Sequence, residues 1–147
     1  MPQATKATPE IPLEEDFPDN GGHLSINPQR WEKSLKSKNE TAKFNKEYNM
    51  AKVLAQNGHK IEMLEEVSGD SSHDIKIDDI KAELKKLSSA NNIEREAKKA
   101  IKKQGADIVI FEFSQLNAKI LQGIERLKRM GIHGKYFASG ENKIYNF

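Results

Sequence analysis

Asp74, Glu83 and Lys85 are the residues of this sequence whose types and spacing most favour chemistry. The stretches 73–77 and 80–85 are predicted as two strands joined by a two-residue turn, which places Asp74 opposite Glu83. Two facing carboxylates repel each other unless a cation lies between them. Lys85, on the same face, or a divalent metal could be that cation. A solvated sheet face with alternating charges is the alternative interpretation.

Two further polar residues interrupt apolar helix stripes. Residues 40–56 predict a helix with Glu47 inside its apolar stripe, and residues 92–104 predict a second helix with Gln104 in line with its apolar face. A buried carboxylate is costly unless it is paired. Glu47 therefore either reaches solvent at the edge of its stripe or points at the polar face of the sheet. Gln104 either hydrogen-bonds the end of its helix or faces the same cleft.

Several cations are candidates for contacting a phosphate backbone. They are Lys76 and Lys81 of the predicted hairpin, and Arg95, Lys98 and Lys102 of the helix predicted over 92–104. Such a run is also typical of a solvated helix face. Residues 1–20 hold one positive and five negative side chains, so residues 21–147 carry 23 positive and 17 negative charges. That net charge of +6 permits a polyanionic partner without requiring one.

Composition excludes several classes of protein. The 147 residues contain no Cys, which rules out a disulfide scaffold, a thiolate zinc site and a Cys nucleophile. The four His residues show none of the spacings of a zinc site. No apolar run approaches the 18 or so residues that span a membrane, and the N-terminus lacks the apolar core of a signal peptide. We therefore expect a cytoplasmic site of action.

The remaining elements predict the fold. All five Pro residues lie within 2–28, so residues 1–20 are predicted to be a disordered, acidic, Pro-containing linker or tail, and residues 21–147 a single domain. The stretch 22–26 suggests a short edge strand that ends at Pro28. Residues 60–64 predict a strand, 107–113 a central strand covered on both faces, and 135–147 a final hairpin, with a helix capped by Ser114 before it. This order favours an α+β fold with a mixed, mostly antiparallel sheet flanked by helices.

Several short motifs together resemble a known group of nucleases. They are Gly21-Gly22-His23-Leu24-Ser25-Ile26, then Glu47, Ala51, Leu54-Ala55 and Gly58, then Asp74, Glu83-Leu84-Lys85, and Lys103-Gln104 before Asp107-Ile108-Val109-Ile110. The pattern resembles the C-terminal nuclease domains of contact-dependent growth-inhibition toxins and of phage minor head proteins, in the barnase–EndoU–colicin–RelE-like group. The resemblance covers residues 21–147.

This resemblance implies an endoribonuclease that cleaves RNA, usually tRNA, without a metal or other cofactor. Carried over by position, Glu47, Asp74, Glu83, Lys85 and Gln104 match the recurrent polar positions. Such a ribonuclease needs a base for the ribose 2′-OH, cations for the phosphate and an acid for the leaving oxygen. A small acidic immunity protein would then cover the basic face. The domain would be delivered as part of a toxin, or be associated with a virion.

The same residues are similar to a second nuclease class, the PD-(D/E)xK endonuclease core. In that case Asp74 and Glu83 would hold Mg²⁺, Lys85 would help to activate a water molecule, and Glu47 would complete the metal site. The substrate would be DNA. A third hypothesis is an inactive structural or partner-binding domain of a phage or toxin protein.

Overall fold

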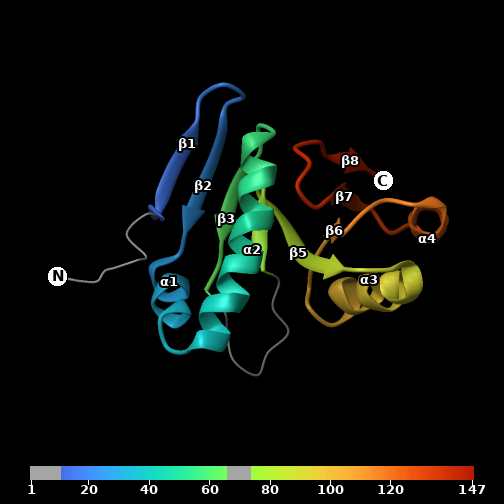
Figure 1. The fold of residues 1–147 in the computed structure, drawn as a ribbon, viewed down its shortest axis with the longest axis horizontal. Coiled ribbons are helices and arrows are strands. Elements are labelled where there is room, and N and C mark those ends of the chain that lie inside the picture. The colour runs from blue at the N-terminus through green and yellow to red at the C-terminus, as the bar shows by residue number, and fades with distance from the viewer. Residues whose placement is uncertain (1–10, 66–73) are drawn as a thin grey trace.

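The computed structural model describes residues 11–65 and 74–147, which form one mixed sheet flanked by helices (Figure 1). Within these residues the sheet has eight strands, which lie side by side in chain order. The strands are β1 (Glu14–Phe17), β2 (Gly22–Ile26), β3 (Lys60–Met63), β4 (Ile75–Ile77), β5 (Ile80–Leu87), β6 (Ile108–Phe113), β7 (Gly134–Ala138) and β8 (Tyr145–Asn146). The helices are α1 (Pro28–Ser34), α2 (Lys38–Gln56), α3 (Ile93–Lys102) and α4 (Ala118–Arg129), with a 3₁₀ turn, η1 (Ala90–Asn92), before α3.

This sheet contains both antiparallel and parallel pairs of strands. The pairs β1–β2, β3–β4, β4–β5 and β7–β8 are antiparallel, whereas β2–β3, β5–β6 and β6–β7 are parallel. Helices make the three parallel crossovers, because a connection between parallel strands must span the length of the sheet. The predicted α+β class, with a mostly antiparallel sheet, is confirmed.

The β4–β5 hairpin has the register that its two-residue turn predicts. Ile77 pairs with Ile80 and Ile75 with Ala82. Asp78 and Asp79 form the turn with φ values of 51° and 70°, in the left-handed region that short hairpins need and that Asp tolerates. This turn therefore fixes which side chains of β4 and β5 share a face.

Strand β6 is buried on both faces, as predicted. Ile110 packs with the core beneath α2, which includes Phe44 and Leu54. Phe111, one residue further, packs with the core beneath α3 and α4. The two faces of the sheet are thus covered by different helices, with α2 on one side and α3 and α4 on the other.

The ordered sheet begins earlier than the composition predicts. Strand β1 lies within the stretch 1–20 that is expected to be a linker or tail, and it pairs along β2. His23 on β2 holds it there, since its ring nitrogens lie 2.6 Å from Glu14 Oε1 and 2.7 Å from Asp16 Oδ1. Strand β2 therefore lies between β1 and β3, and the prediction of an edge strand at 22–26 is wrong.

Two helix starts also differ from the sequence prediction. Pro28 does not merely end a strand: it begins α1, and the side chain of Asn27 accepts hydrogen bonds from the first turn. Helix α4 is capped by Asn117 rather than by Ser114, because the Asn117 side chain accepts from the Ile120 N–H. Helix α3 ends at Lys102, so Gln104 lies just beyond it.

Candidate active site

Asp74 and Glu83 touch each other at the start of the β4–β5 hairpin. The N–H of Asp74 donates to Oε1 of Glu83 at 3.0 Å, and the N–H of Leu84 donates to Oδ2 of Asp74 at 3.0 Å. The two carboxyl groups also share a side-chain hydrogen bond. The register of the hairpin therefore brings together the two acids that the sequence places opposite each other.

Burial makes both acids hard to ionise. Glu83 is only 4% exposed. Burial, and then the charge of Asp74, raises the pKa of Glu83 to about 9. Burial also raises the pKa of Asp74, against the hydrogen bonds and the charge of Lys85 that lower it. A proton or a cation is thus needed to balance this pair at neutral pH.

Lys85 lies beside the pair and is held by three oxygen atoms. Its Nζ is 3.0 Å from Oε1 of Gln104, 3.1 Å from Oε1 of Glu96 and 3.7 Å from Oε2 of Glu83. Lys85 and Glu83 share a face of β5 because they are two residues apart. Gln104 therefore faces the cluster, as one of its two interpretations predicts, rather than only closing the end of α3.

Glu47 approaches the cluster from α2 and is paired with a buried arginine. Oε1 of Glu47 lies 2.9 Å from Nη2 of Arg30, whose side chain is 2% exposed and lies over the ring of Phe44. Burial, and then the charge of Asp74, raises the pKa of Glu47 to about 7, while Arg30 lowers it. The charges of Glu47 and Asp74 are thus coupled, although α2 and β4 are distant in the sequence.

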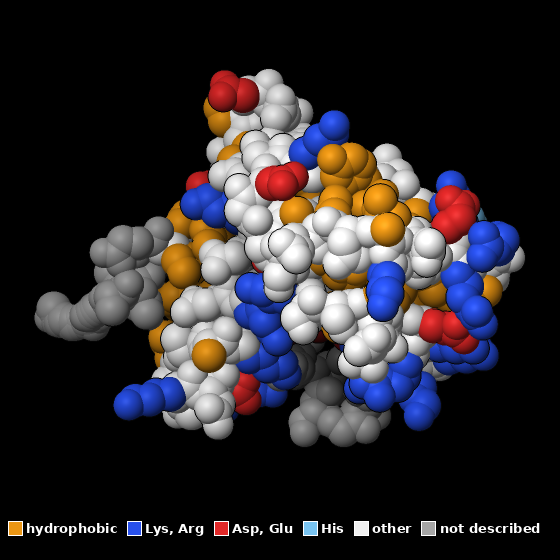
Figure 2. Space-filling view, turned by 45° about the vertical axis from the view of Figure 1, so that its right-hand side comes forward, with side chains coloured by type: hydrophobic (Ala, Val, Ile, Leu, Met, Phe, Trp, Pro, Cys, Tyr) orange, Lys and Arg blue, Asp and Glu red, His pale blue; other side chains and the backbone are white. Residues whose placement is uncertain are grey.

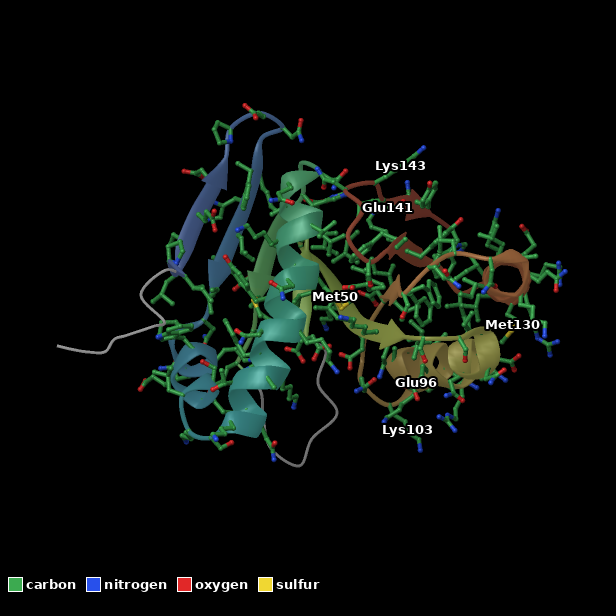
Figure 3. All side chains as sticks on the ribbon, viewed as in Figure 1. Met50, Glu96, Lys103, Met130, Glu141 and Lys143 are labelled. Carbon is green, nitrogen blue, oxygen red and sulfur yellow. The ribbon has the colours of Figure 1, made fainter. Side chains whose placement is uncertain are left out.

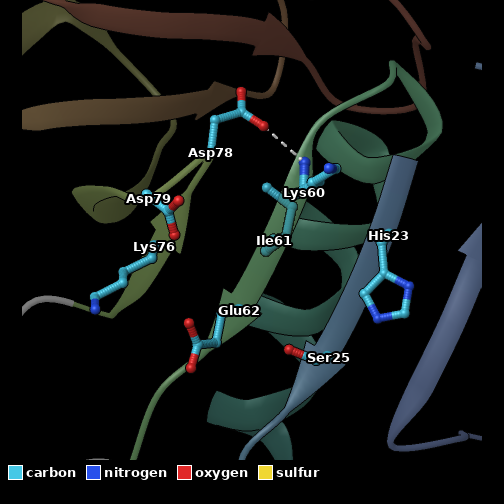
Figure 4. Close-up of a pocket in the computed structure, with 8 residues that line it drawn as sticks. All are labelled: His23, Ser25, Lys60, Ile61, Glu62, Lys76, Asp78 and Asp79. Atoms are coloured by element: carbon cyan, nitrogen blue, oxygen red, sulfur yellow. Dashed lines mark hydrogen bonds between the residues drawn. The ribbon is translucent and has the colours of Figure 1, made fainter. Parts of the chain in front are cut away.

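The predicted backbone-binding cations fall into two places. Arg95, Lys98 and Lys102 line one open hollow of about 530 Å³ along α3, together with Glu96, Lys99 and Lys103. Lys76 and Lys81 face each other on the β4–β5 hairpin. Lys76 lines a separate, smaller hollow with residues of β2 and β3 (Figure 4). The structure therefore does not bring these five cations into one patch.

Sequence reasoning missed Arg30, Glu96 and Lys43. Arg30 lies on α1, which the sequence did not predict. Glu96 precedes Ala100 by four residues and Gln104 by eight, so the row i, i+4, i+8 that leads to Gln104 was a usable signal. Lys43 precedes Glu47 by four residues, and its charge lowers the pKa of both Glu47 and Asp74.

The acids suit a cation that keeps most of its water. Among the described residues, no group of three or more His, Asp or Glu side chains is arranged to hold a metal. Mg²⁺, however, is commonly held by one or two carboxylates plus water or substrate oxygens. Asp74 and Glu83 supply two carboxyl groups in contact, so they fit such an ion.

No helix in residues 11–65 and 74–147 is both long enough and apolar enough to cross a membrane.

Comparison with known proteins bears on the fold alone. No protein-family model matches the chain, and no curated protein matches it. One solved structure is similar: a chain of a CdiA-CT/CdiI toxin and immunity complex from Burkholderia pseudomallei. The match has 20% identity and a TM-score of 0.57, and it covers 84% of this chain and 97% of the other. The fold is therefore similar to that of a chain in this toxin and immunity complex.

Proposed function

We propose that this chain is a toxin-type nuclease that cleaves phosphodiester bonds with the help of a divalent cation. Its active site would be formed by Asp74, Glu83 and Lys85. The observation that carries the proposal is the hydrogen bond between the carboxyl groups of half-buried Asp74 and buried Glu83, with the Lys85 ammonium 3.7 Å from Glu83. The core around them runs helix, three antiparallel strands, helix, parallel strand, which is the order of the PD-(D/E)xK core. The similarity to a chain of a toxin–immunity complex supports the toxin class.

Asp74 and Glu83 would hold the cation, for which Mg²⁺ is the natural candidate. When bound, such an ion lowers the pKa of water and stabilises charge on a phosphate. Lys85 would place its positive charge where the phosphate oxygens gain negative charge, and Glu96 and Gln104 would orient it. Glu47, with a pKa of about 7, would accept a proton near the site.

A metal-free ribonuclease is the second candidate, and one observation favours it. A pKa of about 9 keeps Glu83 protonated at neutral pH, and a pKa of about 7 suits Glu47 to a base. Glu83 would then protonate the leaving oxygen, Glu47 would activate the ribose 2′-OH, and Lys85 would stabilise the phosphate. This mechanism requires RNA, whereas the cation-assisted one accepts RNA or DNA.

We propose RNA, and tRNA first, as the substrate because the resemblance to growth-inhibition toxin nucleases implies it. A phosphodiester-cleaving toxin must be inhibited in the cell that makes it. We therefore also propose an acidic immunity protein as partner, a parent toxin or phage protein, and the cytoplasm of a target cell as the site of action.

The test is to incubate the full chain with total tRNA and with plasmid DNA, each in Mg²⁺ and in EDTA. Glu83→Gln and Lys85→Met are the inactive variants, and Lys119→Met, an exposed residue of α4, is the matched lysine control. Cleavage that needs Mg²⁺ and falls at least about 1,000-fold in both variants supports the cation-assisted nuclease. Cleavage of tRNA in EDTA moves the assignment to the metal-free ribonuclease. No cleavage under any condition contradicts both.

A further inference from the structure

The outer face of α3 carries a groove whose charges are strongly unbalanced. Five cations and one acid line it: Arg95, Glu96, Lys98, Lys99, Lys102 and Lys103. The opposite face of the helix is buried through Ile93, Ala97 and Ala100. Figure 2 shows Lys and Arg side chains gathered on the lower right of the molecule, and Figure 3 places Glu96 and Lys103 at α3. We call these six residues the α3 groove.

Little within the described residues offsets this charge. Lys98 is paired with Glu94 at 2.8 Å, and Arg95 lies 3.6 Å from Glu96. Lys99, Lys102 and Lys103 have no acidic partner within 4.0 Å in the described part of the chain. Like charges one helical turn apart, such as Lys98 and Lys102, destabilise a helix by a few tenths of a kcal/mol. A bound polyanion would remove that repulsion.

The groove adjoins the candidate active site through one side chain. Glu96 lines the groove, and its Oε1 lies 3.1 Å from Nζ of Lys85. Gln104, directly after Lys103, accepts a hydrogen bond at its Oε1 from the same ammonium group at 3.0 Å. A chain of phosphates that follows α3 would therefore reach Lys85 and, beside it, Glu83.

We propose that the α3 groove binds the sugar–phosphate backbone of the nucleic-acid substrate and leads it to Lys85. The inference takes its ligand from the proposed function. The lining contains no aromatic or large apolar side chain, which protein–protein interfaces use as anchors. Because the lining has no aromatic side chain on which a base could stack, the groove contacts only the sugar–phosphate backbone. Its binding is therefore independent of the nucleotide sequence. Its affinity depends steeply on salt.

The test measures binding apart from cleavage. A fluorescently labelled single-stranded RNA of mixed sequence is titrated with Glu83→Gln protein in EDTA, and its anisotropy is followed over a series of KCl concentrations. The test variant adds Lys99→Ala, Lys102→Ala and Lys103→Ala. The control variant adds Lys119→Ala, Lys128→Ala and Lys143→Ala, which remove the same charge from exposed positions elsewhere. Lys143 lies on the opposite side of the view from Lys103 (Figure 3).

The groove variant should bind RNA at least about 10-fold more weakly at 0.1 M salt. Its slope of log affinity against log salt should become shallower by about 2, because three phosphate contacts of a single strand are lost. The control should change by less than about 2-fold. Equal weakening in both variants, or none in either, overturns the proposal. Competition provides a second contradicting outcome. If polyglutamate of matched charge displaces the labelled RNA as well as unlabelled RNA does, the proposal is overturned, because the groove would then be a surface that binds acidic proteins.

Failure of this inference can be told apart from failure of the proposed function. If RNA binding depends on the groove but the protein cleaves neither RNA nor DNA, the proposed role of the groove is supported and the proposed nuclease activity is contradicted. Cleavage that is lost in Glu83→Gln but unchanged when the three groove lysines are removed from the otherwise native chain contradicts the groove alone.

Discussion

The backbone N–H of Asp74 donates to the side chain of Glu83 at 3.0 Å, and the backbone beside Glu83 donates back to the side chain of Asp74 through Leu84 at 3.0 Å. The hairpin backbone therefore holds the two acidic side chains close to each other. Each carboxyl group accepts one hydrogen bond from the backbone of the other arm of the hairpin. The second oxygen of Glu83 lies 3.7 Å from Nζ of Lys85.

This pair predicts that the protein loses stability as the pH rises. The pKa of Glu83 is raised from 4.5 to about 9, so between these values the folded state binds more protons than the unfolded state. Stability from this group is complete below about pH 4.5 and falls as the pH rises through 9. Glu83→Gln mimics the protonated acid, so it should flatten this dependence and stabilise the protein by on the order of 2 kcal/mol at pH 8.5. Urea unfolding at pH 5.0 and 8.5 measures it. A steeper fall in the variant than in the native chain would contradict the assignment.

Divalent cations should stabilise the native chain at alkaline pH, because they replace the shared proton of Asp74 and Glu83. A ligand at ten times its Kd adds about 1.4 kcal/mol to folding stability. The thermal midpoint at pH 8 should therefore rise with Mg²⁺ or Mn²⁺ in the native chain. It should not rise with K⁺ at equal ionic strength, nor with Mg²⁺ in Asp74→Asn. Equal shifts in both proteins would show that the ion binds elsewhere.

Replacing only one partner of the buried Arg30–Glu47 pair should lower the stability of the protein strongly. Arg30→Met leaves Glu47 buried beside Asp74 without its guanidinium, at a cost of about 3 kcal/mol at pH 8. The cost should shrink at pH 5, where Glu47 takes up a proton. A double variant with Glu47→Gln should recover much of the loss, since no charge is then stranded. Chemical unfolding of the four proteins of this cycle measures the coupling, and additive losses would mean that the two side chains act independently.

Gly22 should tolerate no side chain, for a reason of close packing. A Cβ at this position would lie 1.8 Å from the backbone oxygen of Ala55 at the end of α2. Gly22→Ala should therefore cost about 3 kcal/mol or more, because backbone rather than a flexible side chain must move. Gly140→Ala is the control: its φ of +82° costs about 1 kcal/mol, but the space around it is open. Thermal unfolding compares them, and equal losses would contradict the steric argument.

The sequence by itself determined most of the local elements, though not β1 or α1, and it determined the hairpin that carries the chemistry. Alternation and a two-residue turn are short-range signals, so the register of β4 with β5, and with it the opposition of Asp74 and Glu83, followed from spacing alone. The central position of β6 followed equally from its unbroken apolar run. Local signals failed where two interpretations compete, as at Pro28, which can end a strand or begin a helix.

Only the tertiary structure decided what surrounds that hairpin. The acidic composition of residues 1–20 predicts a tail, yet Glu14 and Asp16 are bound by His23 once β1 and β2 pair. Glu47 is coupled to Asp74 and held by Arg30, and Lys85 is held by Glu96, through contacts between elements far apart in the chain. Periodicity assigns a residue to a face of its own helix or strand. It cannot say which other element covers that face, because packing between elements sets their relative position.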